Sequence, residues 1–279
     1  MTWDEVWGYR SKLYLCLLFC CLSMVTGRAQ QMPLTHGERV DYDLYFKWGL
    51  LMPKAGLATL SVKEAQYENK SVWNYRLLFR SLGMIDKVFK MRDTMDCVFS
   101  QEPRLIFSSK RTNEGDYYLV DNLRFTYKED DKVSIRSHRY TEERTKIDTV
   151  LTAEGKVFDM FGATMYLRSL DWTNINTNDE FPFFIPVGRD VVKARFRYSG
   201  QQIVEHGDAK YRTRHFYIDI YDEAFTQTKA AAEVWIGDDD NHIPIKIRAK
   251  LKIGAAEVYF NDSFNLRYPL SCRIVVSKG

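Results

Sequence analysis

Two-residue alternation of apolar and polar side chains runs through most of this chain and predicts β-strands. In the segment 243–253, Ile245, Ile247 and Leu251 alternate with lysine and arginine. Because successive side chains of a strand point to opposite faces, this segment has one aliphatic and one basic face. The segment 40–47 shows the same period, and similar segments follow as far as residue 266. Such a succession is typical of an antiparallel sheet that curves to cover its apolar face.

One segment, 157–172, departs from the period of two. Ala163 and Leu167 lie four residues apart within a larger apolar set, which is the spacing of one helix face. A second stretch, 81–90, is compatible with one or two helical turns. The predicted fold class is therefore mainly β: a curved antiparallel sheet or half-open β-barrel with one central helix. We expect residues 30–279 to form a single domain, with a division into two β halves joined by the helix as the alternative.

The amino terminus carries a predicted targeting segment. Residues 13–25 are almost entirely apolar and follow Arg10 and Lys12. This stretch is shorter than the roughly 20 residues that a membrane-spanning helix needs, and it fits the apolar core of a signal peptide. We therefore expect residues 1–29 to be cleaved and the protein to be exported to the periplasm. An uncleaved membrane anchor and a buried helix are the less favoured alternatives.

Charge and motifs exclude several classes of protein. The chain has 40 lysine and arginine residues against 37 aspartate and glutamate residues, and this near balance predicts no nucleic-acid partner. No polybasic run of the kind that holds proteins on anionic membranes is present. The five histidines form no metal-binding pair, and the sequence contains neither a nucleophile elbow nor a nucleotide-binding glycine motif. We expect no metal, no cofactor and no enzymatic activity.

The acidic clusters favour solvated positions over sites. Residues 238–241, DDDN, have the oxygen-rich composition that calcium prefers, but they lack the ligand spacing of a calcium loop and fit a hairpin turn. Asp93 with Asp96, and Asp219 with Asp222, are three residues apart. On a strand such pairs point to opposite faces, so we expect solvated carboxylates.

Aromatic residues and two cysteines are the remaining candidates. Cys97 and Cys272 are the cysteines outside the leader, and they could form a disulfide or be two small buried residues. The aromatic residues come from several predicted strands, so they either form an ordinary β core or line a cavity for an apolar or amphiphilic ligand. The candidate lining residues are Phe46, Trp48, Trp73, Tyr75, Phe79, Phe161 and Trp235.

Several short motifs together resemble a bacterial envelope family catalogued as domain of unknown function 3108. They are ERVDYD at 38–43, WG at 48–49, KAGLATL at 54–60, RD at 92–93, the segment from Asp159 to YLR at 166–168, and WIGDD at 235–239 followed by IP at 243–244. The resemblance implies an exported protein to which no catalytic residues are assigned. More loosely, the chain is similar to lipoprotein-carrier folds, in which a half-open barrel holds a hydrophobic cavity closed by helix.

These observations lead to three functional hypotheses. The leading one is a periplasmic, non-enzymatic binding or carrier protein whose hydrophobic cavity takes a lipid or another amphiphile. The alternative is a scaffold that binds an envelope protein partner through exposed sheet edges. The third is a hydrolase whose site is assembled from distant residues. The sequence leaves the oligomeric state open.

Overall fold

The computed structural model describes residues 32–88, 90–221, 228–251 and 254–275. The signal peptide predicted over residues 1–29 lies outside this part of the chain. Neither of the two helices among the described residues is long and apolar enough to cross a membrane.

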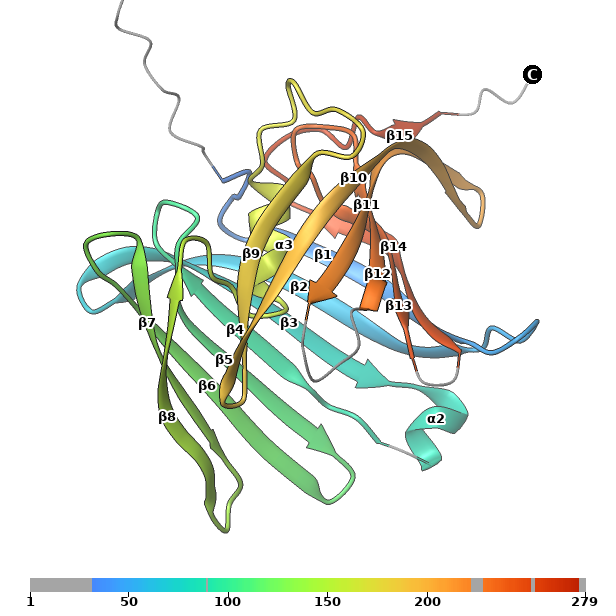
Figure 1. Ribbon diagram of the computed structural model, residues 1–279. Helices are drawn as coiled ribbons and strands as arrows, with labels where there is room; N and C mark the ends of the chain where they lie inside the picture. Colours follow the sequence, from blue (N-terminus) through green and yellow to red (C-terminus); the bar gives the residue numbers. More distant parts are fainter. Residues whose placement is uncertain (1–31, 89, 222–227, 252–253, 276–279) are drawn as a thin grey trace, which may run out of the picture. The chain divides into compact units, whose positions relative to one another are not determined.

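All strands of the described residues belong to one antiparallel sheet, shown in Figure 1. They are β1 (Arg39–Lys47), β2 (Lys54–Tyr67), β3 (Lys70–Ser81), β4 (Thr94–Phe99), β5 (Leu105–Glu114), β6 (Tyr117–Tyr127), β7 (Lys132–Tyr140), β8 (Thr145–Glu154), β9 (Glu180–Val187), β10 (Asp190–His206), β11 (Ala209–Tyr221), β12 (Thr228–Gly237), β13 (Pro244–Lys250), β14 (Ala255–Phe264) and β15 (Arg273–Ile274). The predicted mainly β, antiparallel fold is confirmed.

The strand order follows the chain in two runs that meet at β1. From β1 the sheet continues through consecutive strands to β8, while on the other side β1 pairs with β14 and the sheet continues back to β9. The short strand β15 pairs with β11. Because nearly every neighbour in the sheet is also a neighbour in the chain, tight connections suffice to build it.

The two edge strands, β8 and β9, approach each other and nearly close the sheet into a barrel. Val157, just after β8, forms a parallel bridge with Phe184 of β9. Farther along, the Ser137 hydroxyl of β7 donates a hydrogen bond to the carbonyl oxygen of Gly188, at a distance of 2.8 Å. These contacts cover part of the unpaired sheet edge that an open sheet would expose.

Helix α3 (Gly162–Arg168) connects the two runs of strands and lies within the curve of the sheet (Figure 1). The prediction of a helix over 157–172 was too long. The backbone of Phe158 instead bonds to Phe184 of β9, and the helix ends at Arg168, with Ser169 as its C-cap. Apolar spacing extends beyond the helix because its flanks are buried as well. The other helix, α2 (Gly83–Val88), lies between β3 and β4, within the stretch predicted to form helical turns.

Candidate functional site

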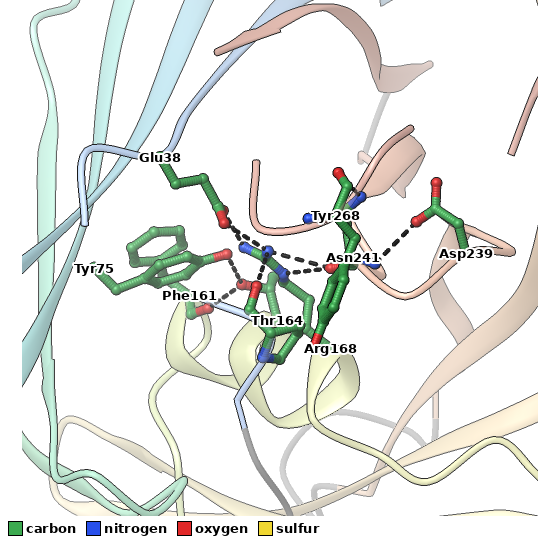
Figure 2. Close-up of polar contacts among 9 residues, drawn as sticks. Glu38, Tyr75, Phe161, Thr164, Arg168, Asp239, Asn241 and Tyr268 are labelled. Atoms are coloured by element: carbon green, nitrogen blue, oxygen red, sulfur yellow. Dashed lines mark hydrogen bonds and ion pairs between the residues drawn. The ribbon is translucent and has the colours of Figure 1, made fainter. Parts of the chain in front are cut away.

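The largest fully buried side chain among the described residues is that of Arg168, at the end of α3. Its guanidinium donates hydrogen bonds of 2.7 and 3.2 Å to the two carboxylate oxygens of Glu38, and both side chains are completely buried. It also donates to the carbonyl oxygens of Pro33 and Asn241 (Figure 2). Burial disfavours the charged guanidinium, but the carboxylate of Glu38 outweighs this effect and keeps the pKa of Arg168 above its ordinary value.

Asn241 completes this network and corrects the prediction of a solvated turn at 238–241. Its side-chain amide donates to the carbonyl oxygen of Tyr268 at 2.9 Å, and its amide oxygen accepts from the Tyr268 N–H at 2.9 Å. Asp239 accepts hydrogen bonds from the backbone N–H groups of Asn241 and Cys272. The turn is thus bound to the carboxyl-terminal segment, and Asn241 is fully buried.

Aromatic stacking holds the start of α3 against β3. The ring of Phe161 stacks on that of Tyr75, with centroids 4.6 Å apart, and the Tyr75 hydroxyl lies 3.2 Å from the hydroxyl of Thr164 (Figure 2). Burial raises the pKa of Tyr75. Three motif segments, at Glu38, at 159–168 and at 235–244, therefore meet around one helix. Because the charges there are paired and shielded from solvent, we interpret this centre as an anchor for α3.

Cys97 and Asp159 form a second buried contact at the amino-terminal end of α3. The Cys97 thiol donates to the carboxylate of Asp159 at 3.2 Å, and the same oxygen accepts the backbone N–H of Gly162 at 2.6 Å. Burial raises the pKa of both side chains. Cys272 is buried elsewhere, beside Gly237, so the two cysteines are not joined in a disulfide.

The prediction of solvated carboxylates was wrong at three positions. Asp96 is buried between two arginines of the neighbouring strands, Arg76 and Arg111, each at 2.5 Å. Register explains this burial, because Arg76 of β3 stands directly opposite Asp96 of β4. Asp219 is likewise buried beneath two arginines of β10, and Asp93 accepts a backbone N–H from β5. Asp222 lies outside the described residues.

Along the inner face of the barrel, burial decreases with distance from α3. On β1, Val40 and Tyr42 are 0% and 4% exposed, whereas the next inward-facing residues, Leu44 and Phe46, are partly exposed. On β13, Ile245 is buried and Ile247 partly exposed. The helix therefore fills one half of the interior, and solvent reaches the inner wall of the other half.

This second part of the interior, here called the open half, has a mostly apolar wall. Its partly exposed, inward-facing side chains are contributed by six strands, and they are Leu44, Phe46, Leu77, Phe79, Met95, Ile218, Ile247 and Val258. On one side the wall becomes polar. Lys110, Asp121 and Arg139 stand opposite one another on β5, β6 and β7, and Asp121 pairs with Arg139. Lys110 is exposed.

The structure places the seven aromatic residues that were predicted to line a cavity in different environments. Phe46 and Phe79 belong to the open half, whereas Tyr75 and Phe161 stack on each other in the core around α3. Trp73 is partly buried against that core. The remaining two lie elsewhere: Trp235 is on the outer face, stacked on His215, and Trp48 is 60% exposed in the β1–β2 connection.

Most of the open half was missed at the level of sequence because its wall is aliphatic. Leu77, Met95 and Val258 look like ordinary core residues in an alternating strand. The sequence pattern does not show where the helix ends, and the end of the helix separates the part of the barrel interior that it fills from the part that it leaves open. The alternation itself had already identified the inward face.

A groove of about 470 Å³ lies along the outer face of β1 and β2. Its lining includes Asp41 and Thr59, which alternate with the inward-facing Tyr42 and Ala58. The carboxylate of Asp41 accepts a hydrogen bond from Thr59 at 2.7 Å and forms an ion pair with Arg39 at 2.8 Å. The carboxylate of Asp41 is thus satisfied by residues of the groove itself. Among the described residues, no group of three or more histidine, cysteine or acidic side chains is arranged to hold a metal ion.

Comparison with known proteins supports the fold and establishes the family. A crystal structure described as a β-barrel-like protein of domain of unknown function DUF1849 from Brucella abortus is similar, with a TM-score of 0.55 and 12% sequence identity. The similarity covers 82% of this chain and 97% of that one, and at this identity it concerns the fold alone. A search of curated protein sequences finds no match. The family described as protein of unknown function (DUF3108) matches residues 41–261, and the chain therefore belongs to this family.

Proposed function

We propose that this chain is a non-enzymatic binding or carrier protein of the periplasm whose open half takes an apolar or amphiphilic ligand. One observation carries the proposal: on several strands the inward-facing apolar side chains pass from fully buried beside α3 to partly exposed beyond it. Leaving such side chains in water costs free energy that a bound apolar ligand would recover. The periplasmic location rests on the predicted leader.

The composition of the wall favours an amphiphile over a purely apolar ligand. Most strands contribute aliphatic or aromatic side chains, but the charged residues Lys110, Asp121 and Arg139 stand together at one side. Since Asp121 is paired with Arg139, the exposed ammonium group of Lys110 gives this side a net positive charge. An acyl chain against the apolar wall and an anionic head group near Lys110 would satisfy both parts.

The polar groups around α3 support a binding role more than a catalytic one. Arg168 and Glu38 are fully buried and satisfy each other, and Asp159 bonds to Cys97 and to the helix start. The scaffold hypothesis has less support, because the sheet edges that would bind a partner approach each other at Val157 and Phe184.

A fluorescence titration with N-phenyl-1-naphthylamine tests the proposal. We expect saturable binding to the purified chain, and about tenfold weaker binding for Ile247→Glu, because the new carboxylate would have to be desolvated by the probe. The matched control is Val150→Glu on the outer face of β8, where the valine is 64% exposed. It should bind like the wild type.

Two results would contradict the proposal. One is a wild-type chain that shows no saturable fluorescence change. The other is an Ile247→Glu variant with native circular dichroism and unchanged affinity. If the titration shows saturable binding, mass spectrometry of the lipids that co-purify with the protein from its own cells should identify the natural amphiphile.

A further inference from the structure

Large apolar side chains are exposed at the end of the barrel where the open half begins. In the β1–β2 connection, Trp48 and Leu51 are 60% and 63% exposed, and Leu50 is completely exposed. On α2, Met84 and Val88 are exposed to a similar degree. Single exposed apolar residues need no explanation, but five on two adjacent connections do.

The connections that carry these residues are neighbours in space. Gly254, in the β13–β14 connection, packs directly against the end of β1, because a Cβ atom on Gly254 would collide with the carbonyl oxygen of Lys47. On the other side, the N–H of Leu82 donates to the carbonyl oxygen of Ala55 at 2.9 Å, which places the start of α2 beside the start of β2. Figure 1 shows the β1–β2 connection and α2 at the same end of the barrel as the start of β14.

We call this surface the rim patch. It comprises the exposed apolar residues of the three connections, namely Trp48, Leu50, Leu51, Met84, Val88 and Leu251. Burial along β1 decreases from Val40 towards Phe46, and Trp48 follows directly. The rim patch therefore borders the entrance to the open half.

Basic residues outnumber acidic ones in the segments that carry the rim patch. The described residues of segments 47–54, 82–92 and 250–254 include one acidic residue, Asp86, and six basic residues, namely Lys47, Lys54, Lys87, Lys90, Arg92 and Lys250. Asp86 pairs with Arg92 at 2.6 Å, and two of the lysines pair with acids outside these segments, Lys47 with Glu257 at 3.6 Å and Lys54 with Asp43 at 2.9 Å. The positive charge of the patch therefore rests on Lys87, Lys90 and Lys250. No segment is polybasic by itself, as the sequence indicated, and the fold brings the three together. Two acidic residues, Glu114 and Asp116, lie beside the α2 segment, because Glu114 bridges to Met91 and the N–H of Gly115 donates to the carbonyl oxygen of Lys90 at 2.8 Å. Glu142 and Glu143 lie on the β7–β8 connection.

We propose that the rim patch docks the open end of the barrel on the surface of an anionic lipid bilayer. Tryptophan and leucine side chains favour the boundary between head groups and acyl chains, and lysines beside them are attracted to anionic head groups. This interaction goes beyond the proposed ligand binding, because it would place the entrance of the open half against the bilayer. It does not depend on that binding, so the two can fail separately.

Cosedimentation of the full chain with lipid vesicles tests the proposal. We expect the wild type to sediment with vesicles of phosphatidylethanolamine and phosphatidylglycerol. The double variant Leu50→Asp, Leu51→Asp should partition about tenfold more weakly, because two apolar contacts with the bilayer are lost. All variants share the same amino terminus, so any contribution of the leader cancels. The matched control is Val150→Asp on the outer face of β8, an edge strand outside the rim-patch connections, where the valine is 64% exposed. It should sediment like the wild type.

The charge contribution is separable from the apolar one. Replacing Lys87 and Lys250 by glutamine should weaken partitioning about fivefold for each lysine on anionic vesicles, but should have no effect on phosphatidylcholine vesicles. High salt should also weaken the partitioning of the wild type onto anionic vesicles.

Three outcomes would overturn the docking proposal. In the first, the wild type does not sediment with anionic vesicles. In the second, the Leu50→Asp, Leu51→Asp variant sediments like the wild type. In the third, the wild type binds no vesicles but self-associates, and the double variant abolishes this self-association. The last outcome would assign the rim patch to a second copy of the chain. Titration of the same variant with N-phenyl-1-naphthylamine in solution should give wild-type affinity, which keeps the two proposals distinguishable.

Discussion

Arg168 donates two hydrogen bonds to the carboxylate of Glu38, which is 130 positions earlier in the chain. The same guanidinium bonds to carbonyl oxygens of Pro33 and Asn241. One side chain therefore joins α3, the segment that enters β1 and the connection between β12 and β13. Such a pair adds little net stability over an apolar core, but losing one partner leaves a buried charge uncompensated.

Glu38→Gln is therefore expected to be strongly destabilising. The substitution keeps the size and the hydrogen-bonding oxygen but leaves the guanidinium of Arg168 buried without its counter-charge. We expect the free energy of unfolding to fall by about 3–5 kcal/mol, measured by urea denaturation. Substituting Arg136, which pairs with Asp148 on the exposed face of β8, should cause no measurable change.

The double variant Glu38→Leu, Arg168→Met separates charge from packing. If the loss in Glu38→Gln arises from an unpaired charge, removing both charges should restore much of the stability. A double variant as unstable as Glu38→Gln would show that the hydrogen bonds to the Pro33 and Asn241 carbonyls are what holds α3.

Asp159→Asn is expected to stabilise the protein at neutral pH. Burial raises the pKa of Asp159, so the folded state favours its protonated form. The stability that this gives is fully present below the unfolded pKa of 3.8 and is lost as the pH rises through the folded pKa. Asparagine stays neutral and can still accept the N–H of Gly162. The gain should be about 1.4 kcal/mol for each unit of the shift.

Urea denaturation of Asp159→Asn and wild type at pH 7 and below pH 4 provides the measurement. The difference in unfolding free energy should be present at pH 7 and shrink towards zero in acid. A variant that is less stable than the wild type at pH 7 would show that the ionised carboxylate strengthens the start of α3 by more than its burial costs.

The strands and the family could be predicted from the sequence because both depend on local patterns. Alternation around Val40 or Ile245 requires only neighbouring residues, and the structure confirms the resulting mainly β fold. The length of α3 could not be predicted, because Val157 and Phe158 bond to β9, which follows much later in the chain. The periodicity of apolar residues predicts that a residue is buried, but it does not predict which backbone groups that residue bonds to.

The candidate site was predictable only in part, for a related reason. An inward-facing apolar residue looks the same in sequence whether a helix covers it or solvent reaches it. Tyr75 and Phe79 are both on the inner face of β3, but Phe161 of the helix connection covers only Tyr75. The Arg168–Glu38 pair was missed because its partners are far apart and each has the composition of a surface residue.

Acidification is expected to weaken the anchor of α3 through His242. Its ring stacks on Trp172 with centroids 3.7 Å apart, and its Nδ1 lies 2.8 Å from the carbonyl oxygen of Arg168. Burial lowers the pKa of His242, so its contribution to stability is present above the unfolded value of 6.5 and is lost as the pH falls towards the folded pKa. Stability should decrease between pH 7 and pH 5.

The variant His242→Asn isolates this contribution. The backbone at this position has a φ of +48°, which asparagine tolerates. Urea midpoints measured across the pH range should fall less steeply for the variant. Some slope should remain, because burial also lowers the pKa of His206 and of His215. An unchanged slope would mean that His242 titrates equally in the folded and unfolded chain.

Gly56→Ala is expected to destabilise the junction of β2 and β3. A Cβ atom at this position would lie 2.5 Å from the carbonyl oxygen of Arg80 and 2.9 Å from the ring of Phe79. The backbone carbonyl cannot move without breaking the register between the two strands, so the free energy of unfolding should fall by about 1–3 kcal/mol. Ser61→Ala, on the outer face of the same strand, is the control and should change little. Equal stability of Gly56→Ala and wild type in urea would mean that β2 and β3 can separate at this point, and that the wall of the open half beside Phe79 is less tightly fixed than its contacts indicate.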